Sequence, residues 1–389
     1  MRFLHTSDWH LGRTLHGVDL LDAQRTVLGE ICRLVSDPLD GIAVDAVIVA
    51  GDVYDRAVPP VEAVTLLADV LAELTRHTTV IVTAGNHDSA IRLGFGSRLF
   101  TERLHIRTAL DGVGLPVMVS DVAVYPLPYL DPDAARTVLS PDDTPLARSH
   151  QAVMSAAMHR VRQDLAARPA GTRSVVVAHA FVVGGAVSDS ERSIAVGGVD
   201  SIAADTFDGI DYVALGHLHG AQQPRSSGAT VLGYSGSPLR YSFSEREHAK
   251  SASLVDLAAD GTVTITASAL TQPRPMAELV GELEHLLADP ALEAHTGDWL
   301  RITVTDRSRP EQLFDRIKSR FPHILQVLHI PTGLGEIGAQ GRVEIGSLTP
   351  RELAADFIEH VTGVMADDRE LALFERAFAE ATAELGSAR

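Results

Sequence analysis

The chain has 389 residues, a length that predicts two or three domains. Its composition, 45% apolar and 22% charged, is ordinary for a soluble globular protein. No apolar run approaches the roughly 20 residues that cross a bilayer, and the first residues lack the pattern of a secretory signal. The single cysteine, Cys32, excludes an internal disulfide and a zinc site built of thiolates. The formal net charge of −18 argues against a protein that coats nucleic acid by itself, because such proteins usually present a basic face.

The first hundred residues alternate between strand-like and helix-like segments, which predicts an α/β layer. A helix begins near Asp22, and apolar runs of strand length occur before and after it. Three strands are predicted in the first hundred residues and two between residues 170 and 220. They are Arg2–Thr6, Ala46–Ala50, Thr79–Ala84, Ser174–Ala178 and Asp211–Leu215. The composition of these five strands is that of buried strands.

The middle of the chain continues as a mixture of strands, helices and turns. Residues 117–128 look like a strand that enters a loop, residues 131–145 are predicted to be an exposed connection, and a helix is expected over 146–167. Further strands are expected at residues 229–232, 251–257 and 262–267. We therefore predict a first domain, residues 1–270, with two stacked mixed β-sheets flanked by helices.

The pattern changes at the proline-rich segment around residues 272–275. A small α+β capping domain is predicted over residues 275–340. A glycine-spaced linker at 333–346 overlaps the end of this domain. Its strand, helix and second strand are expected at 299–305, 310–320 and 324–330.

The last segment, residues 347–389, is predicted to form C-terminal helices. Thr349 and Glu352 make a capping box, with Pro350 at the first helical position. Apolar residues then recur at helical spacing in two stripes. The stripes are Leu353, Phe357 and Val361, and Leu371, Phe374 and Phe378. These helices either pack on their own domain or dock a partner chain.

Five short segments place metal-ligand residues directly after the five predicted strands. They are Asp8-Trp9-His10, Gly51-Asp52-Val53-Tyr54-Asp55, Gly85-Asn86-His87-Asp88, His179 and Gly216-His217-Leu218-His219. In open α/β sheets, ligands gather beyond the carboxyl ends of the strands, so these scattered segments can form one pocket. Asp8 and His10 are two positions apart, as are His217 and His219, and in extended backbone both side chains of such a pair point the same way.

The segments supply oxygen and imidazole nitrogen ligands without sulfur, which suits Mn, Fe, Zn or Co better than Ca or Mg. The candidate metal ligands are Asp8, His10, Asp52, Asn86, His179, His217 and His219. These seven exceed what one ion requires, and two ions that share Asp52 as a bridge account for the number. Two ions roughly 3.5–4 Å apart can clamp the attacking and leaving oxygens of a phosphoester, so the implied reaction is in-line hydrolysis of a P–O bond.

His87 lies between Asn86 and Asp88 and does not have to be a ligand. An imidazole near the leaving oxygen can protonate it or stabilise the charged phosphorane, with Asp88 orienting the ring. His87 and Asp88 are therefore the catalytic candidates. Asp55 is predicted to lie behind the ligands, hydrogen-bonded to a ligand histidine or to a backbone amide.

Each segment by itself also has an ordinary structural explanation. Gly51-Asp52 after a strand can be a turn, Gly85-Asn86 resembles a hairpin turn, and a single histidine such as His179 is usually a satisfied, partly buried residue. The occurrence of all five in order, each after a strand, favours the metal site.

The order D-x-H, G-D-x-x-D, G-N-H-D, H, G-H-x-H resembles the calcineurin-like metallophosphoesterase superfamily, and all five elements are present without substitution. Within that superfamily, the chain resembles the prokaryotic nuclease subunits related to the Mre-type double-strand-break repair nucleases. The resemblance is good to about residue 270. The further stretches that carry it are His5 to Arg13, Gly184 to Val199, Tyr212 to His219, Tyr234 to Pro238 and Ser242 to Glu245.

The resemblance implies that His87 acts on the scissile phosphate and that Mn²⁺ is the activating ion. It assigns one ion to Asp8, His10, Asp52 and His219, and the other to Asp52, Asn86, His179 and His217. It further implies a homodimer within a heterotetramer, joined to an ATPase with a long coiled coil. Such a complex acts as an ATP-dependent exonuclease on double-stranded DNA and an endonuclease on single strands and hairpins, so we expect a cytoplasmic, nucleoid-associated protein of DNA repair, replication and recombination.

Arg13, His16, Arg240 and Tyr241 are candidates for contacts to DNA phosphates, although an exposed loop position or a local salt bridge explains each equally well. Two other functions stay open: a phosphoesterase for small phosphodiesters or phosphoproteins with the same metals, and a non-catalytic binding platform. The chain beyond residue 275 discriminates against the former, because a small-substrate enzyme requires neither a capping unit nor helices that bind an ATPase.

Overall fold

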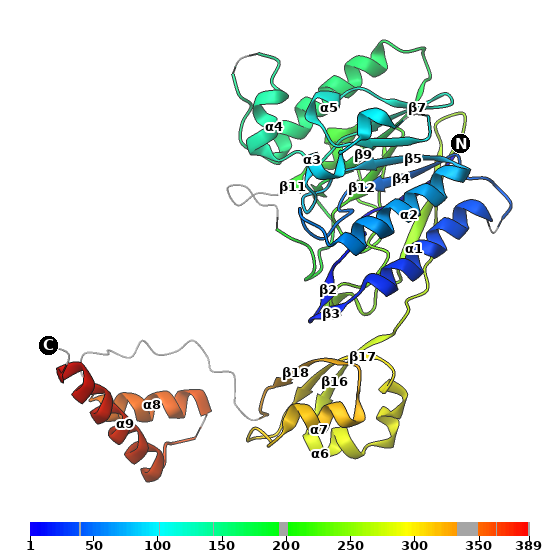
Figure 1. Cartoon of the computed structure of the whole chain (residues 1–389). Coiled ribbons are helices and arrows are strands. Elements are labelled where there is room, and N and C mark those ends of the chain that lie inside the picture. Colours follow the sequence, from blue (N-terminus) through cyan, green and yellow to red (C-terminus); the bar gives the residue numbers. More distant parts are fainter. Residues whose placement is uncertain are drawn as a thin grey trace. The chain divides into compact units, whose positions relative to one another are not determined.

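The computed structural model describes the chain except residues 39, 101, 143, 194–200, 333–348, 363 and 388–389. The chain divides into two compact units, Met1–Ala277 and Glu278–Arg389 (Figure 1). The predicted linker at 333–346 lies outside the described residues, and the division into three domains stays a prediction. Among the described residues, no helix combines the length and the apolar character that crossing a membrane requires.

The first unit contains two stacked mixed sheets, as the sequence predicts. The six-stranded sheet has the order β15-β14-β1-β4-β5-β6, and the five-stranded sheet has the order β13-β12-β9-β8-β7. The strands of the six-stranded sheet are β1 (Arg2–Thr6), β4 (Ala46–Ala50), β5 (Thr79–Thr83), β6 (Leu104–Arg107), β14 (Ser251–Leu257) and β15 (Val263–Ala269). Those of the five-stranded sheet are β7 (Val117–Val119), β8 (Val122–Pro126), β9 (Arg173–His179), β12 (Tyr212–Gly216) and β13 (Val231–Tyr234).

Alternate side chains of the two sheets fill the space between them. Phe3, Ile48 and Ile81 from the six-stranded sheet pack in one cluster with Val124 and Val177 from the other. Because successive side chains of a strand point to opposite faces, the remaining apolar positions face the helices outside. The central strands are therefore apolar on both faces, as their sequences predict.

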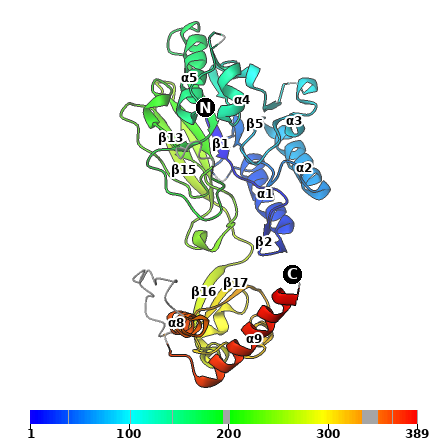
Figure 2. The same cartoon turned by 90° about the vertical axis from the view of Figure 1, so that its left-hand side faces the viewer.

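Helices cover the outer faces of both sheets. Helices α1 (Leu21–Ser36) and α2 (Val61–His77) pack together, with α2 against β5. Helices α4 (Pro132–Val138) and α5 (His150–Ala166) contribute to the apolar cluster on the outer face of the five-stranded sheet. In the turned view, α1 and α2 line one side of this unit and β13 the other (Figure 2).

Short elements complete the first unit between these strands and helices. They are β2 (Thr14–Leu15), β3 (Val18–Asp19), α3 (Ala90–Leu93), η1 (Ser97–Leu99), η2 (Leu110–Gly112), β10 (Phe181–Val182), β11 (Ser201–Ile202), η3 (Ala204–Phe207) and η4 (Phe243–Glu245).

Two predictions for the middle of the chain were wrong. Residues 117–128 form not one strand but an antiparallel hairpin of β7 and β8, because Ser120 adopts a φ of 54° and turns the chain. The stretch 131–145 contains helix α4, which begins where the Asp131 side chain accepts a hydrogen bond from the amide of Asp133. Asp-Pro is a helix-start signal, and burial of Ala135 stabilises the short helix.

The second unit contains the predicted small α+β domain and two further helices. Strands β17 (Trp299–Val304) and β18 (Ile324–His329) are parallel and joined by α7 (Leu313–Arg320), which confirms the predicted strand–helix–strand order. The sequence did not reveal β16 (Met276–Gly281), α6 (Leu283–Ala288) and η5 (Pro290–His295). The C-terminal helices are α8 (Pro350–Thr362) and α9 (Asp368–Ser387). The predicted capping box forms: the hydroxyl of Thr349 accepts from the amide of Glu352, and Glu352 accepts from the amide of Thr349.

Candidate metal centre

The five motif segments meet at one edge of the two sheets. Strands β1, β4 and β5 are parallel neighbours, as are β9 and β12, so their carboxyl ends lie together. Hydrogen bonds join the loops that follow them. The amide of Asp8 donates to the carbonyl of Gly51 (3.1 Å), and the amide of His217 donates to the Asp8 carboxylate (3.1 Å). Residues that are more than 200 positions apart in the sequence, such as Asp8 and His217, therefore meet at this edge.

Two glycines allow the loops to approach this closely. A Cβ atom on Gly85 would lie 2.1 Å from Oδ1 of Asp52, and one on Gly216 would lie 1.8 Å from the carbonyl oxygen of Ala50. No side chain fits at such distances, so glycine before Asn86 and before His217 is a steric requirement of the site.

Four of the candidate ligands have unusual backbone conformations. Asp8, His10 and Asp52 have φ of 54°, 44° and 50°, and His217 has φ of 108°. Such conformations are unfavourable for non-glycine residues and concentrate at functional sites. The expectation that Asp8 and His10 project from extended backbone was therefore wrong, although the structure does bring the two side chains together with His219.

Oδ2 of Asp52 lies at the centre of the candidate ligands. It is 3.7 Å from Nε2 of His10, 3.5 Å from Nε2 of His179 and 3.8 Å from Nε2 of His87. Its partner oxygen, Oδ1, accepts the amide of His87 at 2.9 Å. An oxygen between histidines from different loops has the geometry of a bridging ligand.

The other candidate ligands lie on two sides of Asp52. On one side, Nε2 of His10 faces Nε2 of His219 at 3.0 Å. On the other side, Nε2 of His179 lies 2.9 Å from Oδ1 of Asn86, and the His179 and His217 rings are edge-to-face at 5.4 Å.

The donor set fits divalent metal ions. Three groups each bring one possible ligand atom per residue within 4.8 Å of the others: Asp8, His10 and His219; Asp8, Asp52 and His179; His10, Asp55 and His87. Carboxylates and imidazoles without thiolate suit Mn, Fe, Zn or Co. Buried polar atoms without a hydrogen-bond partner, Nδ2 of Asn86 and Nδ1 of His10, lie among these residues.

Burial sets the protonation of the imidazoles. It lowers the pKa of the His10 ring well below 6.5 and that of His217 to about 3, so both rings are neutral and offer a lone pair. Burial also raises the pKa of the Asp8 carboxyl to about 6. For Asp52, the attraction of His179 outweighs burial and holds the pKa well below its ordinary range.

His87 and Asp55 are in contact, whereas Asp88 has a different role from the predicted one. Nδ1 of His87 lies 2.7 Å from the carbonyl oxygen of Asp55, so this carbonyl, and not Asp88, orients the ring. The Asp88 carboxylate accepts the amides of Val53, Tyr54 and Gly85. It therefore joins the loops after β4 and β5. Oδ1 of Asp55 lies 3.8 Å from Nδ1 of His10, which is too long for the predicted hydrogen bond, so the position of Asp55 behind the ligands stays a prediction.

The four candidate DNA contacts differ in exposure. Tyr241 is buried, its hydroxyl is hydrogen-bonded to the carbonyl of Trp9, and its ring contacts His10. Arg13 lies over the Tyr241 ring and donates to the carbonyl of Ser190. Arg240 donates to the carbonyl of His248, and His16 is exposed beside Phe243. These contacts give Tyr241 and Arg13 a structural role, and DNA binding by the four residues stays a prediction.

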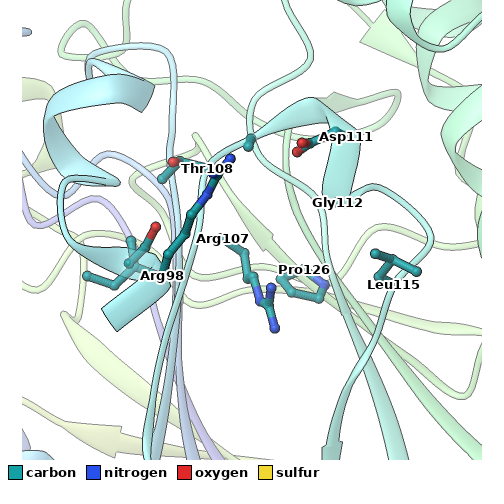
Figure 3. A pocket seen from close by; sticks show the side chains of 10 residues that line it. Arg98, Arg107, Thr108, Asp111, Gly112, Leu115 and Pro126 are labelled. Atoms are coloured by element: carbon teal, nitrogen blue, oxygen red, sulfur yellow. The ribbon is translucent and has the colours of Figure 1, made fainter. Parts of the chain in front are cut away.

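Several residues near the ligands were not singled out as site residues from the sequence. Ser190, Glu245 and Lys250 form a buried polar chain that reaches His219. The sequence signals were the resemblance of the stretch from Gly184 to Val199, which contains Ser190, and of the stretch from Ser242 to Glu245. A separate cavity of about 270 Å³ contains none of the candidate ligands in its lining. Figure 3 shows Arg98, Arg107 and Asp111 around it.

Two family profiles match most of the chain. Residues 1–221 match the calcineurin-like phosphoesterase family, and residues 272–362 match a family described as the Type 5 capsule protein repressor C-terminal domain. The chain is 28% identical over 333 residues to the SbcD component of the SbcCD nuclease of Staphylococcus epidermidis, covering 85% of this chain and 86% of that protein. It is 28% identical over 368 residues to the SbcD component of the SbcCD nuclease of Staphylococcus saprophyticus, covering 93% of this chain and 94% of that protein. Because the first profile spans more than half of the chain, the chain belongs to the calcineurin-like phosphoesterase family.

Proposed function

We propose that this chain is the nuclease subunit of an SbcCD-like complex and hydrolyses DNA phosphodiesters at a centre of two divalent ions, with Mn²⁺ as the activating ion. The observation that carries the proposal is the set of ligand atoms around Oδ2 of Asp52. The relatives with matching length are named as nuclease subunits, which supports DNA as the substrate. The activities inferred from the resemblance are ATP-dependent exonuclease on double strands and endonuclease on single strands and hairpins.

The chain's own residues position the reacting groups. When bound, the ions supply a nucleophilic water at neutral pH and neutralise the charge of the phosphate. Asp52 holds the two sides of the centre at a fixed separation, and the carbonyl of Asp55 fixes the His87 ring. Because a carbonyl only accepts hydrogen bonds, Nδ1 of His87 carries hydrogen and Nε2 faces the centre. Burial lowers the pKa of this ring, so Nε2 has a lone pair at neutral pH. It can take up the proton that the attacking water loses and pass it to the leaving oxygen.

The C-terminal helices are proposed to bind a partner ATPase of the SbcC-like coiled-coil type. Helices α8 and α9 contact each other, with an ion pair between Arg351 and Glu375. Phe357, Leu373 and Phe378 nevertheless stay 65%, 60% and 47% exposed. Apolar side chains exposed on paired helices are typical of a surface that binds another helix.

A homodimer is proposed through the apolar surface of α2, α3 and η1. A groove of about 470 Å³ there is lined mainly by apolar side chains, including Leu67, Leu71 and Phe95. Ile91, Phe95 and Leu99 are each more than 80% exposed. A patch that combines a groove with protruding apolar side chains can bind its own copy in a twofold arrangement.

The direct test is a nuclease assay with the purified ATPase partner and measured metal content. Asp52→Ala is expected to lose both ions and all cleavage, because it removes the bridging oxygen. His87→Ala is expected to keep the ions and lose roughly 10²–10⁴-fold in rate, the usual contribution of an acid–base group. His105→Ala is the matched control, since His105 also has one backbone carbonyl partner, that of Glu102. Cleavage by His87→Ala at the parental rate refutes its role.

The alternative is a metallophosphoesterase for small phosphodiesters or phosphoproteins with the same ions. The length of the match to the nuclease subunits, which extends through the second unit, argues against it. Hydrolysis of a small aryl phosphodiester without any cleavage of DNA by the complex favours this alternative.

A further inference from the structure

The ring of His219 is fixed on the side away from the proposed metal centre. Its Nε2 faces His10, whereas its Nδ1 lies 2.6 Å from Oγ of Ser190 and 3.3 Å from Oε1 of Glu245. The hydroxyl of Ser190 also contacts Oε1 of Glu245 at short range. The three side chains are nearly inaccessible to water. Ring, hydroxyl and carboxylate thus form one buried chain.

Lys250 keeps the Glu245 carboxylate charged inside the protein. Its ammonium donates to Oε2 of Glu245 (2.5 Å), to the carbonyl of His219 (2.9 Å) and to Oγ of Ser237 (2.9 Å). All three N–H bonds are therefore used. The ion pair with Lys250 keeps the Glu245 carboxylate ionised despite its burial. Lys250 is one of only two lysines in the chain, and burying an ion pair is costly, so a functional reason for this pair is expected.

The chain of hydrogen bonds determines which ring nitrogen of His219 carries hydrogen. The ionised carboxylate of Glu245 only accepts, so the short contact requires that Ser190 donates its single hydrogen to Glu245. The Ser190 oxygen then accepts from Nδ1 of His219. Consequently Nδ1 is protonated and Nε2 has a free lone pair that points toward His10 and Asp8.

We propose that Glu245 is a positioning residue that acts through Ser190 to orient His219 and to hold it in the tautomer that offers Nε2 to a metal ion. This inference rests on the proposed two-metal function, in which His219 binds the ion shared with Asp8, His10 and Asp52. Carboxylates that act behind a ligand histidine fix its orientation and raise its basicity. Here a serine makes the shorter contacts to both, beside the direct contact of 3.3 Å between His219 and Glu245. The lysine that pairs with Glu245 also holds the backbone carbonyl of His219.

The test is calorimetric titration of the metal-free full-length chain with Mn²⁺, compared between the parent and Ser190→Ala. That substitution removes one buried hydroxyl without leaving a charge unpaired. One of the two ions should bind roughly 10- to 100-fold more weakly, the usual effect of losing such a partner, while the other keeps its affinity within a factor of two. Ser174→Ala is the matched control, because Ser174 is also buried and its hydroxyl bonds the carboxylate of Asp211. Ser174 lies near the amino end of β9, and Asp211 directly precedes β12. It should leave both affinities unchanged.

A second variant tests the carboxylate itself. Glu245→Gln combined with Lys250→Met removes both charges together, so that neither is buried alone, and it should weaken the same ion as Ser190→Ala. Unchanged affinity for both ions in either variant, or equal loss for both ions in Ser190→Ala, overturns the inference. If the parent binds no Mn²⁺ at all, the proposed function fails instead, so the two failures are distinguishable.

Discussion

Metal binding is expected to displace a proton from His179. In the metal-free protein, Nδ1 of His179 lies 3.0 Å from the carbonyl of Ala50, and Nε2 lies 2.9 Å from Oδ1 of Asn86. Both oxygens only accept hydrogen bonds, so both ring nitrogens carry hydrogen and the ring is a cation. Burial opposes this charge, but the Asp52 carboxylate, supported by Asp8, raises the pKa of His179 to about 9. A metal ion binds Nε2 only after that proton has left.

The size of the effect follows from this pKa. With a pKa of about 9, the neutral fraction of His179 rises about tenfold between pH 7 and pH 8, and the Mn²⁺ affinity should rise by the same factor. A histidine at the ordinary pKa of 6.5 gives only about a 1.3-fold rise over this interval. Titrations at pH 7, 7.5 and 8 in two buffers of different ionisation enthalpy measure both the affinity and the protons released. We expect release of about one proton for the ion bound by His179. A rise in affinity below twofold refutes the reasoning.

The stability of the metal-free protein provides an independent readout. Folding raises the pKa of His179 from 6.5 to about 9, so protonated His179 stabilises the folded state. This contribution is fully present below pH 6.5 and is lost as the pH rises through 9. The shift corresponds to about 3 kcal/mol in total. The depressed pKa of Asp52 reflects the same interaction, so it is counted once. The free energy of unfolding, measured with denaturant, should therefore fall between pH 7 and pH 9 without metal.

Three further predictions concern the metal and the two proposed interfaces. Mn²⁺ should support turnover far better than Mg²⁺ at matched concentration, because imidazole ligands dominate the centre; equal rates in a titration of chelator-treated protein count against this. Deletion of residues 347–389 should leave metal binding and the melting temperature of the nuclease unit unchanged but abolish co-purification with the ATPase. If the complex is retained, these helices serve the fold instead. Phe95→Glu, in the α2–α3 groove, should convert the dimer to a monomer by light scattering. Ile42→Glu, an exposed position that belongs neither to this groove nor to η1, is the control that stays dimeric.

The edge of the sheets at which the site lies was predictable because strand ends are visible in the sequence. An apolar run such as Ala46–Ala50 followed by Gly51-Asp52 marks both the strand and its carboxyl end. Parallel pairing then places Asp52 near Asp8 and Asn86 without any knowledge of distances. Local patterns fix these elements, and the fold brings them together.

The details that could not be predicted depend on contacts distant in sequence. The role of Asp88 is set by the amides of Val53 and Tyr54, which the sequence gives no reason to orient toward it. Ser190 and Glu245 are 55 positions apart, and only the fold reveals that they share a hydrogen bond. The left-handed turn at Ser120 was hidden because neither glycine nor asparagine marks it.

The strained turns and the backbone contacts imply that the site is shaped before any ion binds. Asp8 accepts the amide of His217, Asp52 accepts that of His87, and the ring of His179 is held by the carbonyl of Ala50. In each case the ligand and its partner come from different segments of the chain, so moving one ligand breaks a contact with another segment. A preformed group of carboxylates is unfavourable without a cation, and in the metal-free protein the proton on His179 supplies that charge beside Asp52. The ion replaces this proton, which is why the affinity for metal and the stability of the empty site should depend on pH in opposite directions.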